Sequence, residues 1–526
     1  MDVRRTAFLL GAATNWFAFA ATLAVSFFLT PYLIGTLGTA RYDVWCVAES
    51  VLAYFSLLDM GVAACLVRYV AKHHASADRD GLNRIASACL GVFLAAGVLS
   101  LVLGIPVMWA FAPTLEAKAG HPGDVFGFLL VMLANLAATL PLSVFPSVLD
   151  GLERFAAKSA VRVVFLILRG VGIVWAVQSG PGLLPLALVY TAATLAEHAV
   201  MALLCFRFLP GLRFSWRLID RATLKEVKGY SGDAFLAMLA GRVTAQTGAI
   251  AVGIFLPAGQ VTFFATAMRL VEYAKTLLRT VTATLSPGVS AMEARGEHAA
   301  IGKLFVTATR WVLYAVIPVN LGLWFFGKPF LARWVGSDFV DGSFPAVAIL
   351  ASTLSLGIAQ SAAARILYGV GQLRLFARLA LAEGAANLLL TVTLVQPFGV
   401  GGVAVAVAIP NLIFCVVVIA YTRRLLAVPV GVYLREGWSR PVLAGALPMG
   451  IWLTIGPADA TWPAIATGIA AGLVPYTVLV AGLEVPAQAI RRVLRGFSLV
   501  GRAESSRPDG KRHVGPRRLG PTYKTT

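Results

Sequence analysis

Charged residues are scarce in this sequence: only 13% of its 526 residues are Asp, Glu, Lys or Arg, whereas 58% are hydrophobic. A soluble domain carries about 25% charged residues, so this composition cannot cover an ordinary water-exposed surface. Most of the surface must therefore face an apolar medium, and lipid is the simplest one. The net charge of +19 is also not arranged for nucleic acid, because the basic residues form short clusters between apolar stretches and no continuous basic face.

Motifs for metal binding, disulfides and catalysis are absent as well. The cysteines form no CxxC pair, and the six histidines show no HExxH spacing. The sequence has no P-loop, no GxSxG elbow and no paired acids in a soluble segment. We therefore expect a protein without cofactor or metal that is not an enzyme. The five cysteines all lie in apolar stretches: Cys46, Cys65, Cys89, Cys205 and Cys415.

What the sequence has instead is a series of apolar runs of membrane-spanning length, about 20 residues each. The first run, 7–34, is too long for a signal peptide and lacks an Ala-x-Ala exit, so it is expected to stay as a transmembrane helix. The runs predict an all-α polytopic protein with fourteen transmembrane helices near 8–34, 43–67, 85–111, 125–147, 161–178, 184–208, 230–256, 262–286, 304–327, 344–367, 376–396, 400–421, 441–456 and 462–482.

The basic residues between these spans predict the orientation. If the N-terminus is cytoplasmic, the outer loops hold only Arg41, Lys118, Lys328 and Arg333, and the inner loops hold most of the remaining loop cations. Such a bias fixes topology in bacterial-type inner membranes, so both termini are expected in the cytoplasm. The basic tail, 486–526, is expected to begin with a lipid-surface helix over 486–500 and to end in disorder.

An internal repeat organises the spans. A shift of 219 residues lays helices 1–3 on helices 7–9, with Tyr54 falling on Tyr273 and Val70 on Val289. Six helices return the chain to the same side, so the copies form two like-oriented lobes around a pseudo-two-fold axis along the membrane normal. The predicted division is an N-lobe at 1–226, a C-lobe at 227–425, two further helices at 426–485 and the tail at 486–526. A substrate cleft is expected between the lobes.

Ionisable residues inside the spans mark the expected cleft, because each costs several kcal/mol in lipid unless it faces a cavity or a partner. The eighth span carries Arg269, Glu272, Lys275 and Arg279 at intervals of three to four, which places them on one helix face. Further candidates are Glu49 and Asp59 in the second span, Arg169 in the fifth and Arg242 in the seventh. Several arginines favour an anion, and arginine suits phosphate because its planar fork makes paired hydrogen bonds. The expected ligand is a pyrophosphate-linked amphiphile, although pairs such as Glu272 with Lys275 could be purely intrahelical.

Two segments resemble a known family. The first comprises Thr30-Pro31, Leu37-Gly38-Thr39-Ala40-Arg41-Tyr42-Asp43-Val44-Trp45, Leu58-Asp59-Met60-Gly61 and Arg68-Tyr69-Val70-Ala71, and the second is Leu149-Asp150-Gly151-Leu152-Glu153-Arg154-Phe155. Together they resemble Wzx-like lipopolysaccharide and O-antigen flippases, the polysaccharide branch of the multidrug/oligosaccharidyl-lipid/polysaccharide exporter superfamily. The family usually has Tyr-Gly-x-Trp where this chain has Tyr42-Asp43-Val44-Trp45, a local departure.

The resemblance implies a V-shaped bundle that flips an undecaprenyl-pyrophosphate-linked oligosaccharide across the inner membrane, with membrane lipid and glycan-assembly proteins as partners. An H⁺ or Na⁺ gradient is one possible driving force. A drug/cation antiporter of the MATE branch is an alternative, although helix 1 offers only Asn15 where acids are expected and Glu49 or Asp59 would have to substitute. A peptidoglycan lipid II flippase is another, although helix 1 lacks the expected arginines. A membrane scaffold or glycosyltransferase is disfavoured by the short outer loops at 112–124 and 328–343.

Overall fold

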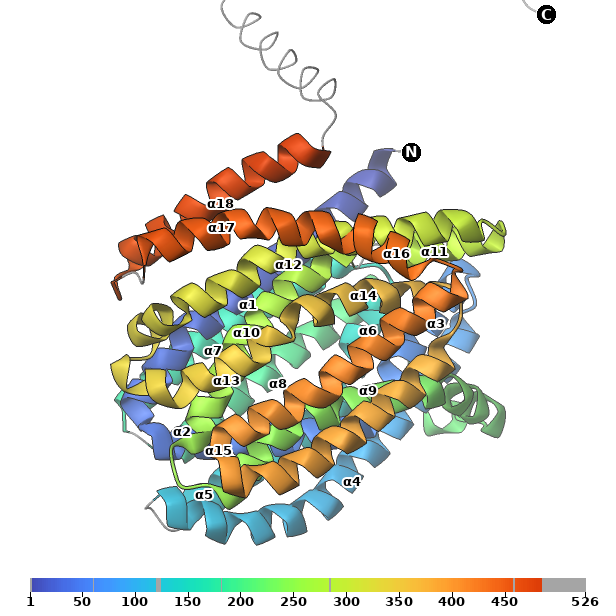
Figure 1. Ribbon diagram of the computed structural model, residues 1–526. Coiled ribbons are helices and arrows are strands. Elements are labelled where there is room, and N and C mark those ends of the chain that lie inside the picture. The colour runs from blue at the N-terminus through green and yellow to red at the C-terminus, as the bar shows by residue number, and fades with distance from the viewer. Residues whose placement is uncertain are drawn as a thin grey trace, which may run out of the picture.

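The computed structural model describes residues 2–59, 61–119, 124–180, 182–282, 285–456 and 459–484, and these residues form helices without any β-strand (Figure 1). The predicted all-α fold is thus confirmed. The elements are α1 (Asp2–Leu37), α2 (Thr39–Phe55), η1 (Ser56–Asp59), α3 (Val62–Ala75), α4 (Arg79–Ala119), α5 (Asp124–Leu142), α6 (Val144–Gly151), α7 (Phe155–Gln178), α8 (Leu183–Phe208), η2 (Trp216–Leu218), α9 (Arg221–Phe255), α10 (Gln260–Thr282), α11 (Leu285–Ala294), α12 (His298–Trp334), η3 (Ser337–Phe339), α13 (Val340–Ser352), α14 (Leu354–Gly369), α15 (Leu373–Leu425), α16 (Val430–Val432), η4 (Tyr433–Ser439), α17 (Arg440–Ile455) and α18 (Trp462–Glu484).

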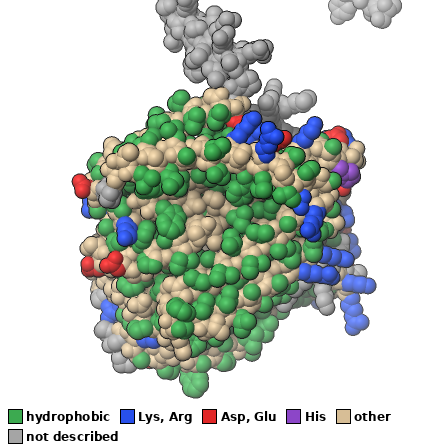
Figure 2. Space-filling model, viewed as in Figure 1, with side chains coloured by type: hydrophobic (Ala, Val, Ile, Leu, Met, Phe, Trp, Pro, Cys, Tyr) green, Lys and Arg blue, Asp and Glu red, His purple; other side chains and the backbone are tan. Residues whose placement is uncertain are grey.

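The outer surface of the bundle is apolar, as a membrane protein requires. Large hydrophobic side chains point outward along the helices, among them Trp109, Leu443 and Val478, each about 70% exposed. Figure 2 shows hydrophobic side chains across the middle of one face, whereas Lys and Arg gather at the end where α3, α11 and α16 lie. Exposed apolar area of this extent is stable only against lipid, so the chain is a multi-pass membrane protein.

Within the described part of the chain, nine helices are long and apolar enough to span a membrane, or eleven if each of two bent helix pairs is one span. The fourteen predicted spans also include α10, which carries four charged residues, and α17, which has only 16 residues. The count of fourteen stays a prediction. The predicted loops 112–124 and 328–343 are shorter than expected, because α4 continues to Ala119 and α12 to Trp334.

The long element α15 is a hairpin rather than one helix. Gly399 has φ 57° and ψ −141°, a conformation outside the helical region that a glycine adopts without strain. On both sides of this break the chain meets itself: Asn411 Nδ2 donates to Glu383 Oε1 at 2.8 Å, and Asn387 Nδ2 donates to the Ala406 carbonyl at 3.2 Å. In a continuous helix, residues 383 and 411 would lie about 42 Å apart. The eleventh and twelfth predicted spans are therefore the two arms of this hairpin.

The bundle has two halves, defined here as the N-half (α1–α8) and the C-half (α9–α15). One hydrophobic core contains residues of both halves, including Trp45, Leu129, Phe264 and Val403. Two other cores are separate: one belongs to the C-half around Phe305 and Ile358, and the other to the N-half around Leu66 and Phe93, reaching the start of α9 at Val227. The halves are therefore packed together at one end, the joined end, and have separate cores at the other, the open end.

The last two helices pack outside these halves. Helices α17 and α18 contact each other and α12, and they lie along one edge of the bundle in Figure 1. The indole Nε1 of Trp452 on α17 donates to the Gly468 carbonyl on α18 at 2.8 Å. The carboxylate of Glu484, at the end of α18, is buried against Arg310 and Arg440 at 3.3 and 3.4 Å. The predicted tail, 486–526, lies outside the described residues.

Candidate functional site

A cavity of about 1060 Å³ lies between the two halves. Its N-half wall comes from α2, η1, α5 and α8, and its C-half wall comes mainly from α9, α10 and α15. Along α10 the lining begins at Phe264, one turn beyond the joined end, and continues to Arg279 in the last turn. The cavity therefore occupies the part of the interface where the common core ends, toward the open end.

Helix α10 supplies the charged stripe that its sequence predicts. Arg269, Glu272, Lys275 and Arg279 all line the cavity, whereas Leu270, Val271 and Leu278 on other faces of the helix are buried in protein. Glu272 lies 3.9 Å from Lys275 Nζ and 3.3 Å from Arg279 Nη1. The Glu272–Arg279 pair is about half exposed, and such a pair contributes little stability, about 0–1 kcal/mol, so a stronger anion can replace Glu272 as the partner of Arg279.

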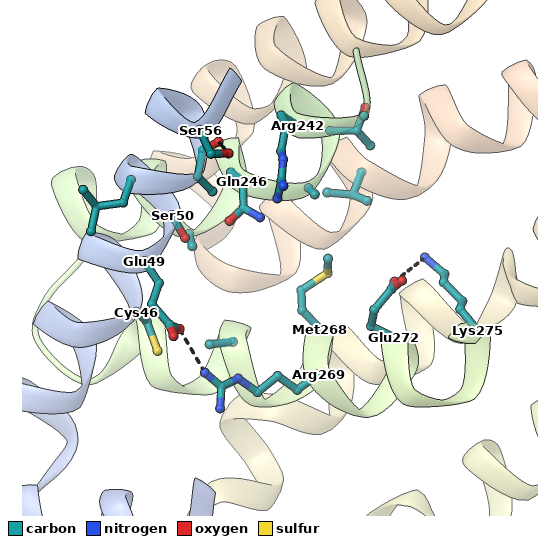
Figure 3. Close-up of a pocket in the computed structure, with 18 of the residues that line it drawn as sticks. Cys46, Glu49, Ser50, Ser56, Arg242, Gln246, Met268, Arg269, Glu272 and Lys275 are labelled. Atoms are coloured by element: carbon teal, nitrogen blue, oxygen red, sulfur yellow. Dashed lines mark hydrogen bonds and ion pairs between the residues drawn. The ribbon is translucent and has the colours of Figure 1, made fainter. Parts of the chain in front are cut away.

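One ion pair crosses the cavity between the halves. Arg269 Nη2 lies 3.2 Å from Glu49 Oε2 on α2 (Figure 3), and Nη1 donates to Thr30 Oγ1 on α1 at 2.8 Å. The guanidinium also lies 5.7 Å from the centre of the Tyr42 ring. Arg269 is thus a lining cation of the C-half that also binds the N-half, through α1 and α2.

Arg242 on α9 differs from the α10 cations. It lines the cavity, and in Figure 3 it points with Gln246 into the space bounded by Glu49, Arg269 and Glu272. Among the described residues, no carboxylate lies within 4.0 Å of its guanidinium. An unpaired cation in a membrane-embedded cavity is costly, so this position is suited to receive an anionic ligand.

Two predicted candidates lie outside the cavity lining. The Asp59 carboxylate accepts the Ala63 N–H at 3.1 Å, which makes it a local cap for α3. Arg169 on α7 pairs with Glu197 at 2.7 Å and lies 4.8 Å from the centre of the Tyr190 ring. Tyr190 itself lines the cavity, so Arg169 stands directly behind the wall.

Sequence reasoning from charges missed the uncharged part of the lining. Asn135, Thr139, Thr194 and His198 face the cavity from α5 and α8. The carboxylate of Glu383 on α15 also lines it. The available signal was spacing, since 135 and 139, and likewise 194 and 198, are four residues apart and therefore share a helix face.

The joined end is held by two charged side chains of the N-half. Asp43 on α2 is 5% exposed and accepts the backbone N–H groups of Gly259 at 2.6 Å and Thr262 at 2.7 Å, and the Thr262 hydroxyl. Lys118 Nζ donates to the carbonyls of Gly253 and Leu256 at 2.6 and 2.7 Å. A carboxylate thus caps the N-terminus of α10 and an ammonium caps the C-terminus of α9, the favourable sign at each helix end. We refer to these contacts as the end clasp.

The end clasp also relates the two copies of the predicted repeat. Asp43 and Thr262 are 219 residues apart, which is the shift that aligns the copies, and they contact each other directly. Equivalent positions on α2 and α10 therefore meet where the halves join. Asp43 is the residue at which the chain departs from the family pattern, and its carboxylate makes contacts between the halves that a glycine could not.

Comparison with known proteins adds the evolutionary context. A family model described as "Polysaccharide biosynthesis protein" matches residues 11–293. The probable low-salt glycan biosynthesis flippase Agl15 of Haloferax volcanii is 23% identical over 455 residues, covering 85% of this chain and 89% of that protein. The uncharacterized membrane protein EpsK of Bacillus subtilis is 24% identical over 425 residues, covering 76% of this chain and 80% of that protein.

Solved structures share the fold. A lipid II flippase, MurJ, in an inward closed conformation matches with a TM-score of 0.70 at 13% identity, covering 90% of this chain and 98% of that one. An inward-facing multidrug resistance MATE family transporter matches with a TM-score of 0.63 at 15% identity, covering 77% of this chain and 94% of that one. At these identities the likeness concerns the fold, which is the one seen in MurJ and MATE transporters.

Proposed function

Because the chain belongs to the polysaccharide biosynthesis protein family, within the multidrug/oligosaccharidyl-lipid/polysaccharide exporter superfamily, we propose that it moves an undecaprenyl-pyrophosphate-type lipid-linked oligosaccharide across the cytoplasmic membrane. Family membership makes the chain a membrane flippase of glycan biosynthesis. The lipid-linked substrate, its use for lipopolysaccharide or polysaccharide, and the mechanism are our proposal. The head group enters the cavity while the polyprenyl tail stays in lipid, and no covalent step is involved.

The observation that carries this proposal is the cation set of the cavity. Arg242, Arg269, Lys275 and Arg279 line a membrane-embedded space, and the carboxylates among the described lining residues are those of Glu49, Glu272 and Glu383. Charged groups inside the membrane cost several kcal/mol each. A diphosphate would supply negative charge to balance these lysine and arginine side chains. Arginine can bind it through paired charge-assisted hydrogen bonds. A cationic drug, the substrate class of the antiporter alternative, would be repelled by these side chains, because they carry charge of the same sign.

We propose alternating access as the mechanism. The two six-helix lobes, 1–226 and 227–425, would rock about their interface while residues 426–485 stay packed on the second lobe. The end clasp and the common core favour a state closed at the joined end, with the cavity on the side of the open end. The Lys and Arg residues at the open end support its placement in the cytoplasm, together with both chain termini. A gradient of H⁺ or Na⁺ would drive the cycle.

The test combines a gene deletion with rescue by variants. Cells without the protein should lose surface glycan and accumulate a lipid-linked glycan intermediate, and the wild-type gene should restore both. Arg242→Gln and Arg269→Gln should each lower export at least tenfold, at an unchanged protein level, because one charge-assisted contact contributes about 1.5–3 kcal/mol. Arg424→Gln, an exposed arginine away from the cavity, is the matched control and should export normally.

Other outcomes identify the alternatives. Normal glycan export without intermediate build-up would refute the flippase proposal. Increased drug sensitivity of the deletion strain with intact glycan would favour the MATE-type antiporter. Lethal depletion with wall lysis would favour a lipid II flippase, a possibility to which the shared fold also points.

A further inference from the structure

The two walls of the cavity differ in chemistry. Among the described lining residues, the four lysine and arginine side chains all come from α9 and α10 of the C-half. Among the described lining residues of the N-half, Glu49 is the one carboxylate, and it is paired with Arg269. The other described lining residues of that wall include no lysine, arginine or acidic side chain. A ligand in the cavity therefore meets an ionic surface on one side and a neutral polar surface on the other.

The neutral surface is built from two regular stripes. Asn135, Thr139 and Ser143 follow one another at intervals of four along α5 and its junction with α6. Thr194 and His198 repeat the same interval on α8, which packs directly against α5. Intervals of four place each set on one helix face. We call these five residues the N-half polar wall.

Hydrogen bonds within the wall leave it rich in acceptors. The hydroxyls of Thr139, Ser143 and Thr194 donate to the carbonyls of Leu136, Thr139 and Tyr190, at 3.0, 2.8 and 2.8 Å. Their oxygen lone pairs remain for a ligand. His198 Nδ1 lies 2.9 Å from the Thr194 carbonyl. Since a carbonyl only accepts, His198 Nδ1 is the donor in this contact.

Asn135 adds an acceptor that has no partner. Its side chain is 7% exposed and lines the cavity, and among the described residues its Oδ1 receives no hydrogen bond. A buried polar atom left unsatisfied costs about 1–3 kcal/mol. The unsatisfied Asn135 Oδ1 is explained if a donor group of a bound ligand forms a hydrogen bond to it.

We propose that the N-half polar wall is the binding subsite for the glycan part of the substrate, and that the C-half cations bind the diphosphate. This inference rests on the proposed function and assigns a side of the cavity to each part of the head group. Sugar hydroxyls can donate hydrogen bonds, and they match the acceptor oxygens of the Asn, Thr and Ser side chains on this surface. A diphosphate has only acceptors at neutral pH, so this wall disfavours it while Arg242 and Arg269 attract it. The head group is thereby oriented across the cavity.

The experiment measures binding of two probes to the purified full-length protein: undecaprenyl diphosphate, and the lipid-linked glycan that accumulates in the deletion strain. Thr194→Val and Asn135→Leu remove acceptors with little change in side-chain volume. Each should weaken binding of the glycan-bearing lipid about 3- to 10-fold, as expected for one uncharged hydrogen bond, and leave undecaprenyl diphosphate unchanged. Arg242→Gln should weaken both probes.

The matched control is Thr244→Val on the opposite wall. Thr244 also lines the cavity and donates to a backbone carbonyl one turn away, that of Ala240 at 3.2 Å. It should bind both probes as the wild type does. Equal weakening of both probes by Thr194→Val and Asn135→Leu, or no weakening of the glycan-bearing one, would overturn the subsite. If the wild type binds neither probe, or no intermediate accumulates, the proposed function itself fails.

Discussion

Removing the Asp43 carboxylate should release the joined end. In the structure this carboxylate is buried and accepts hydrogen bonds from two backbone N–H groups and one hydroxyl, all on the opposite half. Asp43→Ala leaves these donors, at Gly259 and Thr262, facing an apolar space for as long as the halves remain closed there. When the halves separate at this end, water can satisfy the same donors. The substitution therefore changes the free-energy difference between the state that is closed at the joined end and the state that is open there.

The size of the effect follows from the contacts. Two buried backbone N–H groups left without an acceptor would cost about 1–3 kcal/mol each, and loss of a helix N-cap alone costs about 0.5–2 kcal/mol. Relief from burying a charge opposes this cost, because a buried carboxylate loses its hydration. We expect a net shift of about 2 kcal/mol, which is a roughly 30-fold change in the ratio of closed to open populations. Asp43→Asn keeps one acceptor oxygen and should give a smaller shift.

The assay is a distance measurement between spin labels at Thr36→Cys and Ala258→Cys, two exposed positions near the end clasp, in a background without the five buried native cysteines. Asp43→Ala should move the distribution to longer distances. Asp59→Ala is the matched control, because that carboxylate caps α3 within the N-half. An unchanged distribution in folded Asp43→Ala protein would refute the reasoning.

Three further predictions concern single side chains. Lys118→Met should lengthen the same spin-label distance, but less than Asp43→Ala, because water can partly replace a capping ammonium at the rim. Gly151→Ala should lower stability by about 1–3 kcal/mol, because its methyl group would lie 2.7 Å from Val70 Cβ, whereas Gly450→Ala, with open space around it, should not; thermal unfolding in detergent distinguishes them. Glu484→Ala should destabilise the packing of α18 by about 3 kcal/mol by leaving Arg310 buried without its partner, whereas Arg440→Ala at the exposed side of the same cluster should cost under about 1 kcal/mol; protease sensitivity of α18 reports both.

The parts of the site that could be predicted from the sequence are those with a local pattern. The α10 stripe was found because charges at intervals of three to four are conspicuous in an apolar segment. Arg242 was found because an arginine in a span is costly. The same argument selected Asp59 and Arg169, which lie outside the cavity lining. Asp59 caps the start of α3 four residues away, and Arg169 pairs with Glu197 on the neighbouring helix.

The neutral residues of the cavity could not be selected in this way. Asn135 and Thr194 cost little in a helix, and in the sequence they are indistinguishable from residues that pack between helices. Only the packing of α5 against α8 shows that both face the cavity. The Gly in Leu149-Asp150-Gly151 is a similar case: it was noticed as a motif, and the structure explains it by the close approach of Val70.

By itself, the sequence determined that this chain is a helical membrane protein with a cationic helix face, because composition and helical periodicity depend on residues that are close in the sequence. The tertiary structure decided where the two halves join, through Asp43 and Thr262, and which wall of the cavity carries charge. These features depend on contacts between residues hundreds of positions apart. Such contacts arise only when the helices pack, and no local pattern encodes them.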